Sequence, residues 1–351
     1  MIDHVIIMAG GAGTRLWPAS TNTRPKQFMK IGGNDSLITS AIKRGFALDH
    51  RGYVIIVTHR DHLKPALDEC SALPEEMRKR IVILPEPFAR NTAPALMLAA
   101  AWLKWKGEEN SSVIVLAADH IINDTDGFIA SVEKASQLAE KDRLVPFGIP
   151  PVSAETGYGY IEAGKTFLPG LEVVSFKEKP DLKTAVKFVA AGNFYWNSGM
   201  FVYPVSLFYD ELRVHTPEVV EPFDSIDFRD GQFAAEKDLT YLKDIDAITP
   251  VYEKVLKISI DYALMEKSHK IAMAEAEFDW NDVGSWDVIS EIDKSEKNTL
   301  TVKGRNNFVY GDDVQVAFCG VSDLIVVVEE GKILICRKGE SQLVKEVTEK
   351  L

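Results

Sequence analysis

A glycine-rich stretch followed by two basic residues is the part of the chain best suited to handle phosphate. Gly10, Gly11 and Gly13 lack the Cβ atoms that would keep a polyphosphate away from the backbone N–H groups. Arg15 and Lys26 follow and supply two cations. Together, these residue types predict a loop that binds the phosphates of a nucleotide.

Two common phosphate-binding motifs do not fit this loop. A Walker loop closes with Gly-Lys-Ser/Thr, whereas here Gly13 is followed by Thr14 and Arg15. The dinucleotide fingerprint requires a third glycine where this chain has Leu16, and the next expected strand ends without an acid for a ribose. An NAD-linked oxidoreductase is therefore the least favoured function class.

Two aspartate-bearing segments could hold a divalent metal ion against the phosphates. Asp119 follows an apolar run, residues 113–117, and so falls at the C-terminal edge of a sheet, where ligands of α/β proteins bind. Mg²⁺ is usually held by one or two carboxylates and by oxygens of the substrate. Composition alone leaves Asp279 and Asp282 as nearly equal candidates for the second carboxylate.

Three later segments combine amides and carboxylates with glycines and aromatic rings. They are residues 157–161, 176–180 and 196–200. Amides and carboxylates can bond two adjacent hydroxyls of a sugar ring at once. The joint occurrence of the three segments predicts a binding site for a hexose phosphate.

A proline-rich stretch after the third expected strand is the candidate site for the nucleotide base. Its rigid prolines can present backbone carbonyls, at Pro85 and Glu86, to the N–H edge of a purine. Asn91 or Thr92 could reach the ribose. The same stretch also predicts a helix start, because a capping residue is followed by Pro94 in the first turn.

Alternation of short apolar strands with helical patterns predicts the fold of the first half. The expected strands are residues 5–8, 53–57, 80–84, 113–117 and 144–147, and the expected helices are residues 36–48, 61–71, 92–106 and 126–140. Such alternation is typical of an α/β fold with a doubly wound, mostly parallel sheet.

The second half changes character twice. One helix, residues 182–191, separates the sugar-site strands, and residues 204–268 are expected to be mainly helical. The last 50 or so residues contain short strands, among them 333–336 after a turn at 329–332, and a final polar helix from about Ser341. We therefore expect one domain over residues 1–290 and a small β-rich domain over residues 291–351.

Composition excludes several other function classes. A net charge of −12 and a pI near 5.2 argue against a basic face for nucleic acid. Three cysteines without CxxC spacing suggest neither disulfides nor a zinc cluster, which fits the cytoplasm. No apolar run approaches the roughly 18 residues of a membrane helix. We expect no nucleic-acid or membrane partner, and the oligomeric state is left open, with a homodimer as one option.

The glycine loop and the Pro-Lys-Gln at residues 25–27 resemble the signature of sugar nucleotidyltransferases. Residues 86–95 and 278–286 narrow the resemblance to mannose-1-phosphate guanylyltransferases, although Ala89 stands where glycine is usual. Residues 259–262 also match the family, and we interpret Ser259 as the cap of a helix. The resemblance reaches residues 342–345, in a tail similar to the family's left-handed β-helix.

The resemblance implies a Rossmann-like nucleotidyltransferase fold and transfer of GMP from GTP to mannose 1-phosphate, with release of pyrophosphate. The phosphomannose isomerase domain of long bifunctional members is not expected. Asp119 and Asp282 would hold Mg²⁺ or a similar hard divalent cation, since Trp280, Asp282 and Gly284 reproduce the family's metal context. Arg15 would stabilise the pyrophosphate and Lys26 would neutralise the α-phosphate.

The resemblance and the loop chemistry together give two sets of binding residues. The nucleotide set is Ala9, Gly10, Gly11, Gly13, Thr14, Pro85, Glu86, Asn91 and Thr92. The sugar-phosphate set is Gly157, Glu178, Lys179 and Asn197.

Two alternatives to this function stay open. The enzyme could use another hexose 1-phosphate or another nucleoside triphosphate. The chain could also be a non-catalytic regulatory subunit that binds a nucleotide sugar. The full set of Arg15, Lys26, Asp119 and Asp282 weighs against the second alternative, because a binding protein has no need of all four.

Overall fold

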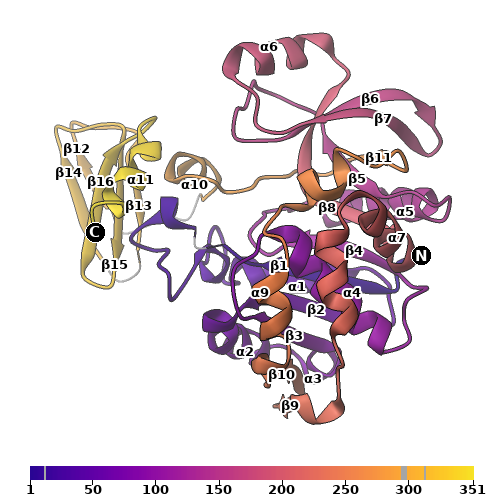
Figure 1. Cartoon of the computed structure of the whole chain (residues 1–351). Helices are drawn as coiled ribbons and strands as arrows, with labels where there is room; N and C mark the ends of the chain where they lie inside the picture. Colours follow the sequence, from indigo (N-terminus) through magenta and orange to yellow (C-terminus); the bar gives the residue numbers. More distant parts are fainter. Residues whose placement is uncertain (12, 294–298, 312–313) are drawn as a thin grey trace. The chain divides into compact units, whose positions relative to one another are not determined.

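The computed structural model describes residues 1–351 except Ala12, 294–298 and 312–313, and the described residues form two compact units (Figure 1). The first unit comprises residues 1–10, 41–118 and 122–280, and the second comprises 11–40, 119–121 and 281–351. Gly11, Gly13 and Lys26 thus belong to the same unit as the C-terminal residues, whereas Gly10 belongs to the first unit. The domain boundary expected after residue 290 stays a prediction.

One eleven-stranded sheet is the framework of the first unit (Figure 1). The strand order is β5-β11-β7-β6-β8-β4-β1-β2-β3-β10-β9. The bounds are β1 His4–Ala9, β2 Val54–His59, β3 Ile81–Glu86, β4 Ser112–Ala117, β5 Val145–Ile149, β6 Tyr160–Phe167, β7 Gly170–Lys177, β8 Phe194–Pro204, β9 Phe233–Glu236, β10 Leu239–Leu242 and β11 Ala272–Glu275.

The parallel block β4-β1-β2-β3 is the predicted doubly wound core. Its strands are continuous runs of Val, Ile and Leu, which is typical of strands covered on both faces. Met8 lies opposite Val57 on one side and Ala117 on the other. The strand β1 is therefore central, and its C-terminal end leads into the glycine loop.

Helices of the first unit pack against this sheet. The bounds of the α-helices are α1 Leu37–Ala47, α2 Leu63–Ser71, α3 Glu75–Arg78, α4 Thr92–Trp105, α5 Thr125–Ala139, α6 Leu182–Ala191, α7 Val205–His215, α8 Pro217–Val220, α9 Thr249–Lys254, α10 Trp286–Ile292 and α11 Val344–Thr348. Among the described residues, no helix has both the length and the apolar character needed to cross a bilayer.

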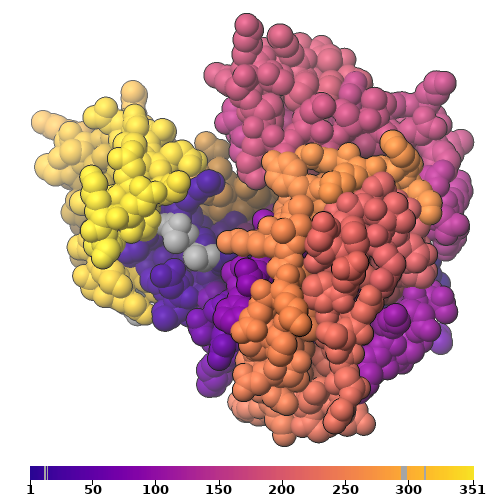
Figure 2. Space-filling view, viewed as in Figure 1, coloured from indigo at the N-terminus to yellow at the C-terminus, as the bar shows by residue number. Residues whose placement is uncertain are grey.

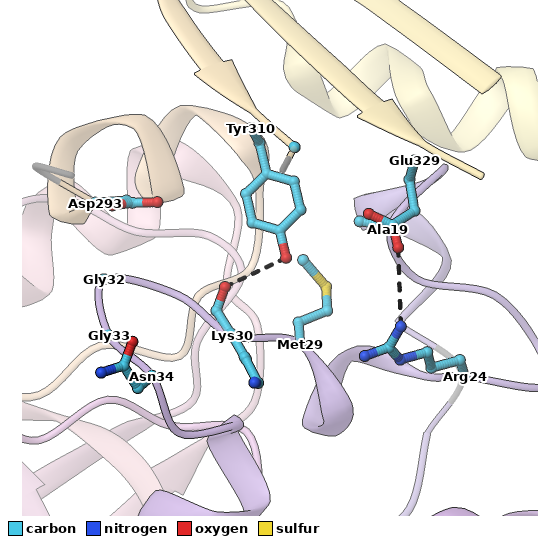
Figure 3. Close-up of a pocket in the computed structure, with 11 residues that line it drawn as sticks. Ala19, Arg24, Met29, Lys30, Gly32, Gly33, Asn34, Asp293, Tyr310 and Glu329 are labelled. Carbon is cyan, nitrogen blue, oxygen red and sulfur yellow. Dashed lines mark hydrogen bonds and ion pairs between the residues drawn. The ribbon is translucent and has the colours of Figure 1, made fainter. Parts of the chain in front are cut away.

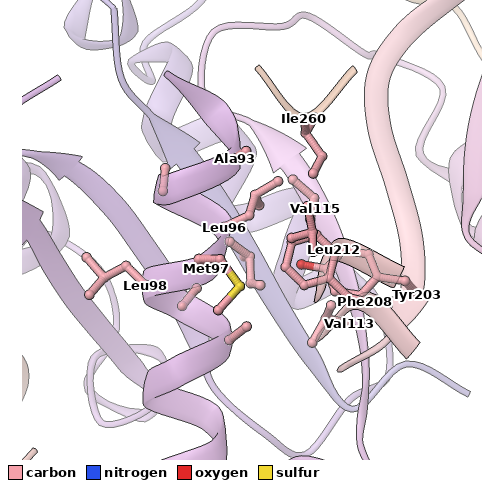
Figure 4. Close-up of a cluster of buried hydrophobic side chains, with 14 of the residues drawn as sticks. Ala93, Leu96, Met97, Leu98, Val113, Val115, Tyr203, Phe208, Leu212 and Ile260 are labelled. Carbon is pink, nitrogen blue, oxygen red and sulfur yellow. The ribbon is translucent and has the colours of Figure 1, made fainter. Parts of the chain in front are cut away.

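The helix α4 is the centre of the main hydrophobic core. Its residues are apolar on every side and almost all are buried. Leu96 and Met97 face Val113 and Val115 of β4, and the side chains of α7 close the same cluster (Figure 4). On the face shown in Figure 2, residues 205–280, which follow β8, cover much of the first unit.

Two predicted features of the first unit differ from the structure. The strand β5, expected in the parallel series, pairs antiparallel with β8 and parallel with β11, because the longer β8 takes the place beside β4. Residues 204–268, expected to be mainly helical, also contain the hairpin β9–β10. These four-residue strands are too short to give a clear alternating pattern.

The C-terminal strands of the second unit pair in a repeating way. Their bounds are β12 Thr299–Val302, β13 Phe308–Tyr310, β14 Val316–Cys319, β15 Leu324–Glu329 and β16 Lys332–Arg337. Thr299 lies opposite Val316 and Phe308 lies opposite Ile325, so two successive parallel pairs have the same spacing along the chain. This repeat is typical of the coils of a β-helix.

A tight hairpin joins β15 to β16 at the predicted turn. Glu330 and Gly331 both have positive φ, 49° and 75°. Two such residues make the type of turn that suits the twist of paired strands. A short polar helix, α11, follows from Val344, also as predicted.

A single hydrophobic core joins the two ends of the second unit. Leu16, Met29 and Ile31, from the segment after the glycine loop, share it with Ile325 and Leu334 of the C-terminal strands. Trp286 is completely buried in the same core, and its indole N–H donates to the carbonyl of Trp17 at 3.0 Å. The segment 11–40 is therefore held in place by residues near the C-terminus.

Candidate active site

Lys26 lies at the centre of a polar cluster in the second unit. Its Nζ donates a hydrogen bond of 2.9 Å to Asp119 Oδ2 and another to the carbonyl oxygen of Asp282. An antiparallel bridge between Ile121 and Asn281 brings the two aspartate segments together. Three of the four residues predicted to be catalytic thus lie in one place.

The glycine loop is shaped to fit this lysine. Gly13 has a φ of +59°, and a Cβ atom added to it would lie 2.5 Å from the Cβ of Lys26. Lys26 begins a 3₁₀ turn, Lys26–Phe28, and its side chain is only 10% exposed. Any larger residue at position 13 would therefore displace the lysine.

The charge of Asp119 is set by its neighbours. Burial alone would raise the pKa of this carboxyl, but the Lys26 ammonium and the His120 ring outweigh burial and hold the pKa below its usual value. The carboxylate is also about one-third exposed. Asp119 is therefore ionised at neutral pH and accessible to a ligand.

The structure separates the two aspartates that composition left nearly equal. Asp279, in the first unit, accepts hydrogen bonds from the backbone N–H groups of Asn123 at 2.8 Å and Asp124 at 2.7 Å. Asp282 lies in the second unit with Asp119, and a Cβ added to Gly284 would be 3.2 Å from its carboxylate. Asp279 therefore anchors the loop before α5, and Asp282 is the better metal candidate.

Arg15 lies in the 3₁₀ turn Thr14–Leu16, which follows the glycine loop, and is exposed. Its guanidinium makes no ion pair or hydrogen bond with any residue that the structure describes. The side chain of Thr14, a predicted nucleotide contact, lies outside the described part. Arg15 is thus available to a ligand, but it is not joined to the Lys26 cluster.

A side chain of the neighbouring strand β2 holds the end of β1. The predicted nucleotide contacts Ala9 and Gly10 lie at this end. Thr58 Oγ1 donates a hydrogen bond of 2.8 Å to the carbonyl of Ala9. A Cβ added to Gly10 would meet no described atom within 4 Å. The backbone at Gly10 therefore borders open space.

Two of the predicted sugar residues meet in the first unit. The carboxylate of Glu178 lies against Gly159: a Cβ atom added to Gly159 would be 2.6 Å from Glu178 Oε2. The backbone N–H of Asn197 donates to the Gly159 carbonyl at 2.8 Å. Lys179 pairs with Glu178. The predicted glycine, Gly157, is exposed and has no described atom within 4 Å of an added Cβ.

Asp261 is the residue of this cluster that sequence reasoning missed. Its Oδ1 accepts a hydrogen bond of 2.9 Å from Asn197 Nδ2. We expected residues 259–262 to be only a helix start, and Ser259 does accept a bond from the Tyr262 N–H at 3.4 Å. Periodicity gives no sign of a π-helical turn, which here begins at Asp261 and ends at Met265.

The side chains of the predicted base and ribose residues are bonded within the protein. Glu86 is buried and accepts from the Tyr252 hydroxyl at 3.1 Å. Asn91 caps α4, and Thr92 Oγ1 accepts from the Ile260 N–H at 2.8 Å. The backbone of Pro85 and Glu86 is thus better suited to a ligand than these side chains are. A ribose contact by Asn91 or Thr92 stays a prediction.

A cavity of about 420 Å³ lies in the second unit (Figure 3). Two polar contacts cross its walls: Arg24 pairs with Glu329 at 3.8 Å, and the Tyr310 hydroxyl donates to the Lys30 carbonyl at 3.3 Å. Each contact joins the segment that carries Lys26 to a C-terminal strand. The cavity was not predicted from the sequence.

Two family descriptions match the chain. Residues 4–299 match the family described as Nucleotidyl transferase, and residues 297–351 match the MannoseP isomerase/GMP-like beta-helix domain. The first match covers most of the chain, and the second covers the repeating strands at its end. Both agree with the fold class predicted from the sequence.

Named relatives match almost the whole chain. It is 36% identical to the Mannose-1-phosphate guanylyltransferase of Escherichia coli K12, covering 99% of this chain and 73% of the relative. It is 37% identical to the Alginate biosynthesis protein AlgA of Pseudomonas aeruginosa, covering 99% of this chain and 71% of that protein.

A solved structure shares the fold over the full length. The crystal structure described as a mannose-1-phosphate geranyltransferase from Thermus thermophilus has a TM-score of 0.82 and 27% identity, covering 100% of this chain and 99% of its own. The likeness therefore includes both the α/β core and the β-helix-like end. Together with the family matches, it shows that the chain belongs to the nucleotidyl transferase family.

Proposed function

We propose that the protein transfers GMP from GTP to mannose 1-phosphate and releases pyrophosphate. The observation that carries the proposal is the Lys26 cluster, in which one buried ammonium bonds Asp119 and the backbone of Asp282 beside the glycine loop. Relatives 33–37% identical over 99% of the chain, several of them named mannose-1-phosphate guanylyltransferases, support the choice of substrates.

The reaction brings two polyanions together, so charge neutralisation and alignment carry most of the catalysis. An oxygen of the sugar phosphate attacks the α-phosphorus of GTP, and the bond from this phosphorus to the bridging oxygen breaks as pyrophosphate leaves. The sugar phosphate is already ionised at neutral pH and needs no general base. Lys26 neutralises charge at the α-phosphate, and Arg15 stabilises the departing pyrophosphate.

Asp119 and Asp282 fit a hard divalent cation such as Mg²⁺. Both supply carboxylate oxygens, and Asp119 is ionised and partly exposed. No group of three or more His, Cys, Asp or Glu side chains in the described ranges forms a complete metal site. Oxygens of the substrate would therefore complete the coordination, as is usual for Mg²⁺. When bound, the ion neutralises phosphate charge.

The remaining predicted contacts complete the proposal. Glu178 and Asn197 bind sugar hydroxyls, Gly157 contributes a backbone contact, and Lys179 approaches the sugar phosphate. The glycine loop, Ala9, Gly10, Gly11, Gly13 and Thr14, binds the phosphates of GTP. The stretch with Pro85, Glu86, Asn91 and Thr92 binds its base and ribose. The bonded side chains of this stretch favour contact through the Pro85 and Glu86 backbone.

We also propose a cytoplasmic enzyme, because all three cysteines, Cys70, Cys319 and Cys336, are free thiols, which fits a reducing compartment. No nucleic-acid or membrane partner is part of the proposal. A homodimer stays a prediction, which light scattering of the purified protein would test.

A panel of substrates tests the proposed reaction. Pyrophosphate release would be measured with GTP, ATP, UTP and dTTP, each against mannose 1-phosphate and glucose 1-phosphate, with and without EDTA. We expect GTP with mannose 1-phosphate to react fastest and EDTA to abolish the rate. A faster pair of other substrates would support a different nucleotidyltransferase. Calorimetric binding of GDP-mannose without pyrophosphate release would support the regulatory subunit.

A further inference from the structure

Asp261 forms part of the wall of a small cavity in the first unit, beside Asn197. The cavity has a volume of about 70 Å³, and its lining includes Met8, Asn197, Gly199, Phe201, Asp261 and Met265. It lies at the C-terminal end of β1, the edge of the parallel block where ligands of such sheets bind. Neither the sequence motifs nor the reaction proposed above gives Asp261 a role.

The backbone before Asp261 is rigidly held. The side chain of Ile260 is buried in the α4 core (Figure 4), and its N–H donates to Thr92 Oγ1 at 2.8 Å. One residue later the chain enters the π-helical turn that ends at Met265. Such turns are rare and occur frequently at functional sites. The cap residue of this turn, Ile260, makes no side-chain hydrogen bond, and the Asp261 carboxyl accepts one from its own backbone N–H.

The carboxyl of Asp261 and the amide of Asn197 fix each other. Asn197 Nδ2 donates to Asp261 Oδ1 at 2.9 Å, and Asn197 Oδ1 accepts from the Gly199 N–H at 3.1 Å. Both ends of the amide are therefore held in one orientation. A carboxylate has two oxygens and about four acceptor positions, so the bonds from Asn197 and from its own backbone N–H leave acceptor capacity on Asp261.

The charges around the cavity favour a neutral hydrogen-bond donor as ligand. Burial and the negative charge of Glu178 together raise the pKa of Asp261 to about 6. The nearby cation, Lys179, is paired with Glu178, and its side chain is 63% exposed. The carboxyl of Asp261 and the amide oxygen of Asn197 thus give the cavity wall two acceptors, with the negative charge of Glu178 nearby. Such a surface suits the hydroxyls of a sugar ring and disfavours a phosphate.

We propose that Asp261 is a specificity-determining residue that accepts a hydrogen bond from one ring hydroxyl of the hexose 1-phosphate. The proposal deepens the proposed function and rests on it. A hydrogen bond to a charged group in a site that excludes water contributes about 10- to 100-fold to kcat/KM. A sugar that lacks this hydroxyl leaves the carboxyl unpaired and is rejected.

The test combines one substitution with a set of substrates. The kcat/KM of the wild type and of Asp261→Asn would be measured with the parent hexose 1-phosphate and with its single-deoxy analogues, at saturating GTP. We expect Asp261→Asn to lower kcat/KM about 10- to 100-fold for the parent sugar. For one deoxy analogue, the two enzymes should have equal kcat/KM values, because the hydroxyl that bonds Asp261 is already absent from the sugar. The KM for GTP should not change.

Two further variants serve as controls. Glu266→Gln removes an exposed carboxylate directly after the same π-helical turn and should leave all rates unchanged. The loss of kcat/KM in Asn197→Ala should disappear with a different deoxy analogue, so that this variant couples to a different hydroxyl from that of Asp261. If both variants couple to the same hydroxyl, Asp261 only positions Asn197, and the proposal is wrong.

Other outcomes also overturn the proposal. Equal loss with every sugar means a general structural role, and no loss at all means no contact. If Asp261→Asn does not fold, the test uses the wild-type enzyme alone. The proposal then fails when no single-deoxy analogue has a kcat/KM more than about 10-fold below that of the parent sugar. A wild type that prefers another hexose or nucleotide overturns the proposed substrates instead, and the coupling is then measured with the sugar it uses.

Discussion

At the scale of single residues, Lys26 connects the predicted groups that lie farthest apart in the sequence. Its ammonium bonds Asp119, 93 positions away, and the backbone of Asp282, 256 positions away. Only 10% of its side chain is exposed. One side chain therefore orders both proposed metal ligands and also faces the loop proposed to bind phosphate.

Lys26→Ala should lower kcat by about 10² to 10³, by analogy with the loss of one preorganised contact to developing charge. The KM for mannose 1-phosphate should change much less. Steady-state kinetics at saturating magnesium would measure both. Lys30→Ala is the matched control, since Lys30 is exposed and lies four residues further along the same segment. A Lys26→Ala enzyme with full turnover and an intact fold would remove Lys26 from the mechanism.

Glu86 makes the stability of the protein depend on pH. Burial raises the pKa of this carboxyl to about 8, although the hydrogen bond from Tyr252 opposes the shift. In the unfolded chain Glu86 releases its proton above the ordinary carboxyl pKa of 4.5, whereas in the folded protein it keeps this proton up to about pH 8. Between these two values the folded protein loses up to about 1.4 kcal/mol of stability for each pH unit gained.

Glu86→Gln should remove this loss, because the amide keeps an acceptor for Tyr252 and has no proton to release. Urea unfolding at pH 5 and pH 8 would measure it. We expect the variant to gain stability relative to the wild type as the pH rises. Glu76→Gln, on the exposed surface of α3, should follow the wild type at both pH values. A Glu86→Gln protein with the wild-type pH dependence would contradict the assignment.

At the scale of elements, the glycine loop and the turn that carries Lys26 act as a pair. Gly13→Ala would place a methyl group 2.5 Å from the Cβ of Lys26 and would force an unfavourable positive φ. Activity should therefore fall about as far as in Lys26→Ala. Gly33→Ala, in the same unit, meets no described atom within 4 Å and needs no positive φ, so it should stay active.

Kinetics together with thermal unfolding would separate the two effects of Gly13→Ala. We expect a large loss of kcat with a small change in Tm, because Gly13 lies outside the core around Trp286 and outside a smaller core of Val309, Phe318 and Val326. Equal activity in the Gly13 and Gly33 variants would show that the loop tolerates a side chain. The proposed fit between the loop and the lysine would then be wrong.

Elements with a strong pattern could be predicted from the sequence, and elements defined by distant contacts could not. The helix Leu182–Ala191 has the predicted bounds, because Asp181 caps its start and Gly192 ends it with φ +76°. The carboxyl of Asp261 was missed, because its role depends on Asn197, which is 64 positions away. The hydrogen bond between Lys26 and Asp119 could likewise not be predicted, because the two residues are 93 positions apart.

At the scale of the whole molecule, the C-terminal strands stabilise the segment that carries Lys26. Ile325 and Leu334 share one core with Leu16, Met29 and Trp286. The ion pair between Arg24 and Glu329 and the hydrogen bond from the Tyr310 hydroxyl to the Lys30 carbonyl add polar links within the same unit. The β-helix-like end should thus affect catalysis although none of its residues is predicted to touch a substrate.

Two isoleucines of the C-terminal strands make a matched test of this dependence. Ile325 is fully buried in β15, whereas Ile335 in β16 is 64% exposed. Ile325→Ala should cost about 2–5 kcal/mol through the cavity it leaves. It should also loosen the segment 11–40, so kcat should fall in the folded enzyme and proteases should cut this segment faster. Ile335→Ala should change neither quantity. A destabilised Ile325→Ala enzyme that keeps the wild-type kcat below its Tm would mean that the Lys26 segment holds its position without the C-terminal strands.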